Sequence, residues 1–300
     1  MTARLIDGKA IAHAVREEVA QEVAELRERG VEPGLAVMLV GEDPASHVYV
    51  GMKTRACEAA GIAARDVRLP AETTVEEILS RLDGLNADPA VHGILVQLPL
   101  PDQANAAAVM ERIRPEKDVD GFHPVNVGRM TSGDPEAFRP ATPAGIQEML
   151  RRIEVDPAGR HAVIVGRSNI VGRPMATILS QKEPGANATV TIAHSRSADL
   201  AAITRSADIL IVAVGRPEAV TADMVADGAV VIDVGVNRVE APDSGKGYRL
   251  VGDVAFEEVR EKAAWITPVP GGVGPMTIAM LLRNTVAAAR RLGAPVSAGI

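Results

Sequence analysis

The sequence predicts an α/β protein of two domains, each built on a mostly parallel sheet flanked by helices. Its 300 residues are enough for two domains with a core each. Short apolar runs rich in Val, Ile and Leu alternate along the chain with amphipathic stretches, which is the pattern of strands joined by helices. Phe, Trp and Tyr make up only 2% of the residues, so small aliphatic side chains must fill the cores.

The first half of the chain contains three predicted strands separated by helices. An amphipathic helix is expected at residues 8–29. The apolar run in "LAVMLVGEDP" (35–44) predicts a buried strand that ends at turn residues. The elements expected next are a helix at 45–60 that ends at Gly61, a strand at 64–68, a helix at 74–87 and a strand at 91–98.

Glycines and prolines interrupt this pattern between residues 114 and 143, where we expect a long loop or a crossing between domains. A helix is predicted at 143–153, with Thr142 as its N-cap and Pro143 at its first position. A second alternating series follows. Strands are expected at 161–166, 188–193, 208–214, 229–234 and 263–267, and helices at 172–182, 198–205, 221–226 and 277–293.

The last predicted helix has no strand after it, so it is free to return and pack on the first domain. We therefore expect a discontinuous first domain, residues 1–141 plus 277–300, and a second domain at residues 142–276. The last seven residues, 294–300, are expected to form a loose tail.

The charge balance argues against nucleic acid or an acidic membrane as a partner, because the net charge is −7 and both signs are interspersed. No apolar run approaches the roughly 18 residues of a membrane span. The amino terminus becomes charged before any apolar segment of signal-peptide length. The single Cys57 cannot form an internal disulfide, so a cytoplasmic location is expected.

The segment "HAVIVGRSNIVGRPMA" (161–176) predicts a strand, a glycine turn and the start of a helix. Gly166 would let the backbone approach a phosphate, while the helix offers free N–H groups at its positive end. The motif departs from G-x-G-x-x-G, because Ser168 occupies the second glycine position and the spacing is longer. An ordinary glycine turn remains the alternative.

The next predicted strand, in "TVTIAHSRS" (189–197), lacks the terminal acid that usually binds the ribose of NAD. It ends in His194, Ser195 and Arg196 instead, and Arg167 follows the first glycine. Two guanidiniums and a hydroxyl suit a 2′-phosphate, so a preference for NADP is predicted. The alternative is that both arginines are ordinary surface residues.

Tyr49 and Lys53 stand one helical turn apart, which places them on the same face of the predicted helix. Short-chain dehydrogenases use a Tyr-x-x-x-Lys pair, but there the pair follows the glycine turn, whereas here it precedes it. A plain surface contact is the simpler explanation. Gln97 makes chemistry more plausible, because it interrupts an apolar run at the end of a predicted strand, where α/β sheets bind ligands. A buried amide there needs a partner such as a lysine.

Two further segments combine unusual residue types. Asp120, in "KDVDGFHP", lies in the irregular crossing; an Asp-Gly turn would explain it, and a metal site with Asp118 is not expected. The segment "ITPVPGGVGPMTIAML" (266–281) joins three prolines to three glycines, which predicts a stiff loop that presses its backbone against a flat ligand.

Taken in order from about residue 5 to 290, these segments resemble the bifunctional methylenetetrahydrofolate dehydrogenase/methenyltetrahydrofolate cyclohydrolase family. The resemblance implies one-carbon folate chemistry: NADP oxidises 5,10-methylenetetrahydrofolate to the 5,10-methenyl cation, and water opens that cation to 10-formyltetrahydrofolate at the same site. It also implies a Rossmann-like NADP-binding second domain, an active site in the cleft between the domains, and a homodimer formed through the cofactor domain.

Matched by position, Lys53 resembles the family's catalytic lysine, Gln97 its hydrogen-bonding partner and Tyr49 the residue that stacks on the folate. Asp120 resembles the acid that holds the pterin. The remaining substrate contacts expected are Leu98, Pro268, Pro270, Gly271 and Gly272. The cofactor contacts expected are Gly166, Arg167, Ser168, Ser195 and Val236, to which the phosphate argument adds Arg196.

The sequence departs from the family at Ala141 and Ala193, where relatives often have Cys. Since the implied mechanism uses no thiol, activity is expected to survive. Two other functions stay open on the residues alone. One is an NADP-dependent dehydrogenase of another small substrate, such as a shikimate-type enzyme. The other is a non-catalytic nucleotide-binding module, which would have no reason to keep Lys53, Gln97 and Asp120 together.

Overall fold

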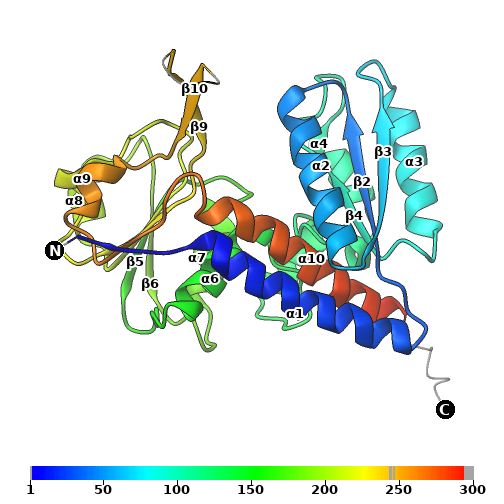
Figure 1. Ribbon diagram of the computed structural model, residues 1–300, viewed down its shortest axis with the longest axis horizontal. Helices are drawn as coiled ribbons and strands as arrows, with labels where there is room; N and C mark the ends of the chain where they lie inside the picture. Colours follow the sequence, from blue (N-terminus) through cyan, green and yellow to red (C-terminus); the bar gives the residue numbers. More distant parts are fainter. Residues whose placement is uncertain (1, 243–244, 246, 294–300) are drawn as a thin grey trace. The chain divides into compact units, whose positions relative to one another are not determined.

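The structure is a computed structural model that describes residues 2–242, 245 and 247–293 (Figure 1). The expected tail at 294–300 lies outside these residues. Contacts divide the chain into two compact units. One contains the residues up to His13 together with Pro140–Thr277, and the other contains Ala14–Arg139 together with the residues from Ile278 onward. Each unit holds a parallel sheet, which confirms the predicted α/β class.

The unit that contains Ala14–Arg139 is built on a three-stranded parallel sheet in the order β3-β2-β4. Every residue of its central strand β2 is buried, as expected for a parallel strand covered on both faces. The elements of this sheet and its connections are β2 (Gly34–Val40), α2 (Pro44–Ala59), β3 (Ala63–Leu69), α3 (Val75–Ala87), β4 (Gly93–Val96), α4 (Ala106–Arg112), η1 (Pro115–Lys117) and α5 (Pro124–Thr131).

Helix α2 is placed by its two ends. The Asp43 side chain accepts a hydrogen bond from the backbone N–H of Ser46 at 2.8 Å and so caps the amino terminus. At the other end Gly61 has a φ of +78°, which a residue without Cβ adopts freely. The Gly61 and Ile62 N–H groups donate back to Glu58 and Cys57, which is a Schellman motif. The predicted stop at Gly61 is therefore confirmed.

Helices α1 (Gly8–Glu28) and α10 (Val273–Leu292) lie side by side (Figure 1). Arg283 pairs with Glu18 at 2.9 Å and Arg290 pairs with Glu22 at 2.7 Å. Both helices run from one unit into the other. None of the helices that the structure describes combines the length and apolar character needed to cross a membrane.

The unit that contains Pro140–Thr277 is built on a six-stranded parallel sheet in the order β1-β11-β8-β7-β5-β6, with a separate hairpin of β9 and β10. Its strands are β1 (Arg4–Leu5), β5 (His161–Val165), β6 (Thr189–Ala193), β7 (Ile209–Val212), β8 (Val230–Asp233), β9 (Asn237–Glu240), β10 (Tyr248–Val251) and β11 (Trp265–Ile266). Its helices are α6 (Ala141–Arg152), α7 (Gly172–Ser180), α8 (Leu200–Arg205), η2 (Ala222–Met224) and α9 (Phe256–Arg260).

The structure corrects four expectations. The amino terminus groups with the second half of the chain, because β1 pairs with β11. The segment 114–143 is not wholly irregular, since it contains α5. Residues 221–226 form only a 3-10 turn. Thr142 is not an N-cap: Pro140 occupies that position, and the Thr142 hydroxyl lies 2.9 Å from that of Thr277.

Candidate active site

Lys53 and Gln97, 44 residues apart in the sequence, are in direct contact. Lys53 Nζ on α2 donates to Gln97 Oε1 at 2.9 Å. The amide nitrogen of the same side chain, Nε2, donates to the carbonyl oxygen of Leu98 at 2.7 Å. The Gln97 backbone N–H donates to the Met38 carbonyl oxygen on the neighbouring strand β2. Gln97 is thereby oriented with its acceptor toward the lysine, at the carboxyl end of β4 where α/β sheets bind ligands.

The environment of Lys53 favours its neutral form. The side chain is half-buried, and this burial lowers the pKa of Lys53 from its usual value, while the nearby Asp120 carboxylate opposes the shift. Burial also raises the pKa of Asp120 to about 6, against the opposing effect of Lys53 and with a further contribution from Asp118. A lysine whose pKa is lowered and a carboxyl group whose pKa is raised, close to each other, are typical of acid–base sites.

Asp118 organises the loop that carries Asp120. Its carboxylate accepts hydrogen bonds from the backbone N–H of His123 at 2.8 Å, the backbone N–H of Phe122 at 3.3 Å and the Asn126 amide at 2.8 Å. Asp118 is buried and satisfied by these donors. The two aspartates therefore differ in role: Asp118 holds the turn, and Asp120 is the one close to Lys53.

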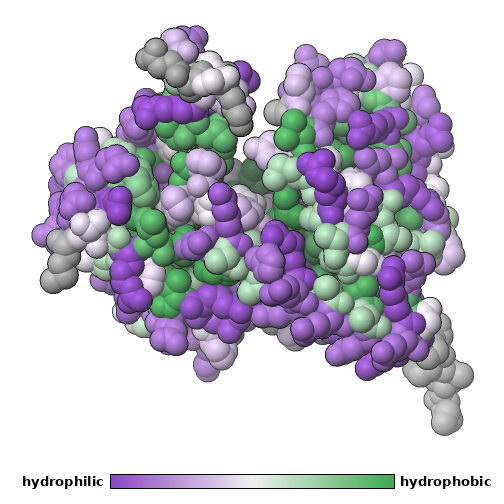
Figure 2. Space-filling model, viewed as in Figure 1, coloured by the Kyte–Doolittle hydropathy of each residue, from purple (hydrophilic) through white to green (hydrophobic). Residues whose placement is uncertain are grey.

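An apolar surface stands beside Lys53 on α2. Val48, Tyr49 and Met52 are 61%, 47% and 41% exposed, which is high for large apolar side chains. Figure 2 shows polar side chains over most of the visible surface, with apolar areas between them. An exposed aromatic ring one turn from a desolvated lysine suits a flat ligand that needs both stacking and a proton acceptor.

The Pro-Gly loop at 268–272 belongs to the unit with the six-stranded sheet and is tightly folded. Gly271 has a φ of +114°. A Cβ on Gly272 would come within 2.7 Å of the Pro268 carbonyl oxygen, so no larger residue fits without a shift. The bond between Val269 and Pro270 is cis. Gly271 and Gly272 are buried, whereas Pro268 and Val269 are half-buried and Pro270 is exposed, so contact of this loop with a flat ligand stays a prediction.

A cavity of about 340 Å³ opens where β5, β6 and β7 end. Gly166 follows β5 with a φ of +133°, and a Cβ there would come within 2.3 Å of the Ala213 carbonyl oxygen. A Cβ on Gly172, the first residue of α7, would come within 2.2 Å of the Gly166 oxygen. Both glycines are therefore required by close backbone packing, and the space left open is large enough for part of a nucleotide. The lining residues are Val165, Gly166, Arg167, His194, Ser195, Leu200, Ala213, Val214, Arg216, Ala219 and Val220.

Of the six expected cofactor residues, Gly166, Arg167 and Ser195 line this cavity. Arg196 and the 48% exposed Val236 are not among its lining residues. Neither is Ser168, whose hydroxyl accepts hydrogen bonds from the backbone N–H of Val171 at 3.1 Å and of Gly172 at 3.4 Å and so shapes the turn.

Two arginines line this cavity, and of these Arg167 was predicted from the sequence whereas Arg216 was missed. A signal was available in the sequence, because the tripeptide Val-Gly-Arg occurs twice, at residues 165–167 and at residues 214–216. The first copy begins at the last residue of β5, and the second begins two residues after the end of β7. Neighbouring parallel strands end at the same edge of a sheet, so the two arginines were candidates for one site.

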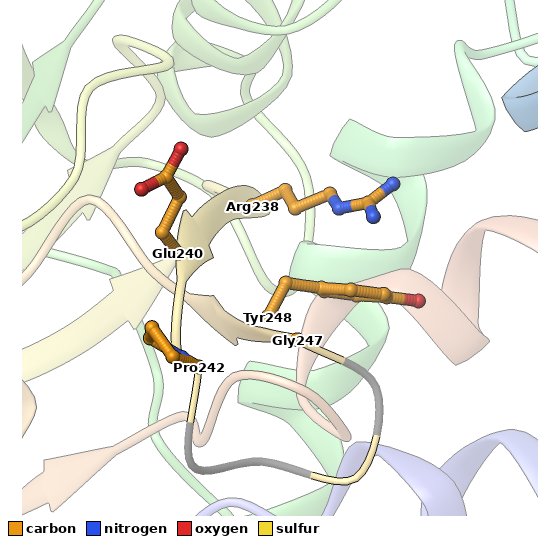
Figure 3. Close-up of a pocket in the computed structure, with 5 residues that line it drawn as sticks. All are labelled: Arg238, Glu240, Pro242, Gly247 and Tyr248. Carbon is orange, nitrogen blue, oxygen red and sulfur yellow. The ribbon is translucent and has the colours of Figure 1, made fainter.

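Another hollow, of about 570 Å³, lies on the β9–β10 hairpin (Figure 3). The Arg238 guanidinium lies 3.7 Å from the centroid of the Tyr248 ring, a cation–π contact that joins the two strands. Glu240, Pro242 and Gly247 complete its lining. The stacked pair accounts for this feature as a stabilising contact of the hairpin.

Comparisons with known proteins agree with the geometry. Residues 6–120 match the family described as tetrahydrofolate dehydrogenase/cyclohydrolase, catalytic domain, and residues 140–292 match its NAD(P)-binding domain. A bifunctional protein FolD of Moorella thermoacetica is 58% identical over 291 residues, covering 97% of this chain and all of the relative. Bifunctional protein FolD 1 of Myxococcus xanthus is 57% identical over 289 residues, covering 96% and 98% of the two chains.

Among solved structures, the Trypanosoma brucei methylenetetrahydrofolate dehydrogenase-cyclohydrolase in complex with NADP and an inhibitor is similar over 98% of this chain and 100% of that chain. Its TM-score is 0.93, with 41% sequence identity. This similarity covers both units, and it therefore excludes the two alternative functions, a shikimate-type enzyme and an isolated nucleotide-binding module. The chain belongs to the tetrahydrofolate dehydrogenase/cyclohydrolase family.

Proposed function

We propose that this protein oxidises 5,10-methylenetetrahydrofolate with NADP and then hydrolyses the 5,10-methenyl product to 10-formyltetrahydrofolate, with Lys53 as the central catalytic group. The observation that carries the proposal is the 2.9 Å contact between Lys53 Nζ and Gln97 Oε1, made by a lysine whose pKa burial lowers. Membership in the family supports both activities.

The dehydrogenase step needs positioning more than acid–base chemistry. Bound NADP would supply the acceptor for the hydride that leaves the methylene carbon of the folate. The chain's part is to hold each ligand in a single orientation. Gly166, Arg167 and Ser195 would bind the nucleotide, because they line a cavity that is large enough for part of it. Tyr49 would stack on the aminobenzoyl ring, and Asp120 would accept hydrogen bonds from the pterin.

The cyclohydrolase step needs a proton acceptor. Water attacks the bridging carbon of the methenyl cation, and the neutral amine of Lys53 takes one proton from that water. The resulting ammonium returns this proton to N5 as the carbon–N5 bond breaks, and the hydroxyl on the carbon releases its remaining proton to solvent, which leaves the formyl group on N10. Lys53 suits this task because its lowered pKa makes the neutral amine available closer to physiological pH. The cationic substrate favours the neutral amine further. Gln97 keeps Nζ oriented through the hydrogen bond that it accepts.

The unit of Ala14–Arg139 and the residues from Ile278 onward would then form the folate-binding catalytic domain, and the unit of Pro140–Thr277 with the residues up to His13 the cofactor domain. Leu98 and the loop of Pro268, Pro270, Gly271 and Gly272 would complete the folate contacts, while Ser168 and Val236 would contact the cofactor. We further propose a homodimer in the cytoplasm. The fully buried thiol of the single Cys57 fits a reducing compartment, since it forms no disulfide within the chain.

The replacement Lys53→Met tests the proposal. It removes the amine and keeps most of the side-chain volume, so cyclohydrolase activity is expected to fall by about 10³-fold, within the usual range for a lost general base. The affinity for NADP is expected to stay within about twofold, because the nucleotide cavity is built from other residues. Stopped-flow hydrolysis of methenyltetrahydrofolate and calorimetric titration with NADP measure the two quantities.

Arg55→Met is the matched control, because Arg55 is an exposed cation on the same helix. It removes the same charge without reaching Gln97, and both activities should persist. Normal hydrolysis by Lys53→Met would overturn the assignment of Lys53. Failure of the unaltered protein to reduce NADP when methylenetetrahydrofolate is supplied would overturn the function itself.

A further inference from the structure

We propose that Arg216 is a specificity-determining residue, whose guanidinium binds the 2′-phosphate of NADP together with Arg167. The inference deepens the cofactor site and rests on the proposed NADP-dependent function. The sequence pattern predicted that Arg196 supplies the second guanidinium at the 2′-phosphate, and this proposal gives that role to Arg216 instead.

The two arginines lie at the same edge of the six-stranded sheet. Strands β5 and β7 pair in parallel, with Val165 opposite Val212. The turns that follow them touch, since a Cβ on Gly166 would come within 2.3 Å of the Ala213 carbonyl oxygen. Arg167 and Arg216 therefore leave neighbouring turns, and both line the 340 Å³ cavity.

The turn that carries Arg216 is held in place by a buried carboxylate. The buried carboxylate of Asp253 accepts hydrogen bonds from the backbone N–H groups of Val214 at 2.7 Å, Gly215 at 2.9 Å and Arg216 at 2.9 Å. The Asn237 amide donates to the same carboxylate at 2.8 Å. A fixed backbone reduces the entropy that the arginine loses when it binds an anion.

The wall of the cavity has two chemically different parts. One part is apolar and suits an adenine ring: Leu200, Ala213, Ala219 and Val220. The other part presents Arg167, His194, Ser195 and Arg216. No acidic residue is among the described residues that line it, although the whole chain carries a net charge of −7. A site with an aromatic-sized apolar slot and a cationic rim fits an adenosine phosphate.

The two guanidiniums are also available for a ligand. Within residues 2–242, 245 and 247–293, no carboxylate pairs with the side chain of Arg167 or Arg216, whereas many other arginines of the chain, such as Arg112 and Arg283, form ion pairs. Arg196 is exposed and lies next to Ser195, but it does not line the cavity. Its backbone N–H donates to His194 Nδ1 at 3.1 Å, which orients the ring rather than the guanidinium.

The test compares dissociation constants of NADP and NAD by titration calorimetry on the full-length protein without folate. Arg216→Gln is expected to weaken NADP about tenfold, the loss of roughly one charge-assisted contact at an exposed site, and to change NAD by less than about twofold. Arg216→Lys keeps the charge but not the fork of donors, so an intermediate loss of about threefold for NADP alone is expected.

Arg205→Gln is the matched control, since Arg205 is an exposed arginine of the same unit whose side chain bonds the Asp223 carbonyl oxygen and does not line the cavity. It should leave both constants unchanged, which supports a local effect at Arg216. If Arg216→Gln weakens the binding of NADP and NAD equally, Arg216 contacts the adenine that both share, and the proposal is overturned. A larger loss of NADP selectivity in Arg196→Gln would overturn it as well. Because no folate is present, a failure of the proposed folate chemistry would leave these ratios unaffected.

Discussion

A lysine is normally a cation at neutral pH, and Lys53 becomes a base only through what surrounds its amine. Burial lowers the pKa of Lys53, and the Gln97 carbonyl accepts a hydrogen bond from Nζ without adding a negative charge. A neutral amide is therefore the right partner: it orients the amine and leaves the lowered pKa in place. A carboxylate in the same position would orient it equally well but hold it protonated.

Replacing Gln97 by Glu tests this reasoning. The added carboxylate should raise the pKa of Lys53 by about one unit or more, because an opposite charge within hydrogen-bonding distance favours the ammonium. Since the active form is the neutral amine, the rising limb of the cyclohydrolase pH profile should move to higher pH. Activity at neutral pH should fall about tenfold, and part of it should return in alkaline buffer.

Gln103→Glu supplies the control, because Gln103 is exposed in the same unit and bonds only backbone carbonyl oxygens in the described structure. It introduces the same charge away from Lys53 and should leave the pH profile in place. If Gln97→Glu lowers activity by the same factor at every pH, the amide acts by shape alone and the pKa argument fails.

Asp120 gives a second pH dependence at the same site. Its pKa is raised to about 6, chiefly by burial. A carboxylate must be ionised to accept two hydrogen bonds from a pterin, so the dissociation constant of a folate analogue should rise as the pH falls below about 6, by up to tenfold per unit. Fluorescence titrations between pH 4.5 and 8 would measure this, and Asp120→Asn should give a weak, flat profile.

The sign of the matching stability effect follows from linkage. The folded pKa of Asp120 lies above the unfolded value of 3.8, so the native state binds this proton more tightly. Its contribution disfavours folding increasingly as the pH rises from about 4 to 6 and is constant above. For the binding experiment, a dissociation constant of the folate analogue that does not change across pH 6 would show that Asp120 is not the group that contacts the ligand.

At the level of single residues, the sequence pointed to Lys53, Gln97 and Gly166 as candidates, and it did not point to Arg216, which lines the cavity beside Arg167. The first three follow rules that operate along the chain: helical spacing, strand ends and glycine turns. Arg216 joins Arg167 through the pairing of β5 with β7, which brings together residues 49 positions apart. The prediction favoured Arg196 because it is adjacent to Ser195 in the sequence, and adjacency does not determine which way a side chain points.

The same division holds for helices and strands. Long periodic segments such as α2, α3 and α10 were predicted to within a few residues. Helix α5 was missed because it lies among glycines and prolines and is capped by His123, whose Nδ1 accepts from the Val125 N–H at 3.1 Å. Strands β9 and β10 were missed because they are short, contain no buried residue and are joined by a Pro- and Gly-containing connection. Strand β1 has only two residues.

Asp253 connects several of these elements, and its replacement tests how far the cofactor unit depends on it. Asp253→Asn keeps the volume but turns one acceptor into a donor that faces backbone N–H groups. Loss of charge-assisted bonds to a buried group should cost about 2–3 kcal/mol of unfolding free energy and weaken NADP severalfold. Urea unfolding followed by circular dichroism, with NADP titration of the folded variant, would measure both.

Asp227→Asn is the control, since Asp227 is 88% exposed and pairs only loosely with Lys262 at 3.6 Å. It should change the unfolding free energy by less than about 0.5 kcal/mol. An Asp253→Asn protein as stable as the original, with unchanged NADP affinity, would mean that the turn of residues 214–216 is fixed by other contacts.

Over the whole molecule, α1 and α10 are the elements that belong to both units. The first turns of each helix group with the six-stranded sheet and the remainder with the three-stranded sheet. The expected domain boundary near residue 277 agrees with this division at α10, whereas the start of the chain was assigned to the wrong domain. A two-residue strand carries too little pattern to reveal that β1 completes a sheet whose other strands come more than 150 residues later.

The reactivity of the single Cys57 can measure local unfolding, here called opening, of the unit that contains it. Its thiol is fully buried, and burial raises its pKa to about 12, so the native protein holds an unreactive thiol rather than a thiolate. Labelling by a thiol reagent should therefore occur only when the Ala14–Arg139 unit opens. A folate analogue at 100 times its dissociation constant should slow labelling about 100-fold, because it binds the closed state alone.

NADP at the same multiple of its own constant stabilises the other unit directly and should slow labelling of Cys57 by a smaller factor. Some protection is still expected, because opening the cofactor unit removes the first turns of α1 and α10, and the rest of both helices packs with the unit that holds Cys57. Labelling rates measured in mild urea, with fully unfolded protein as the reference for a free thiol, distinguish the cases. Equal protection by both ligands would mean that the units open together, and no protection by NADP would mean that α1 and α10 transmit no stability between them.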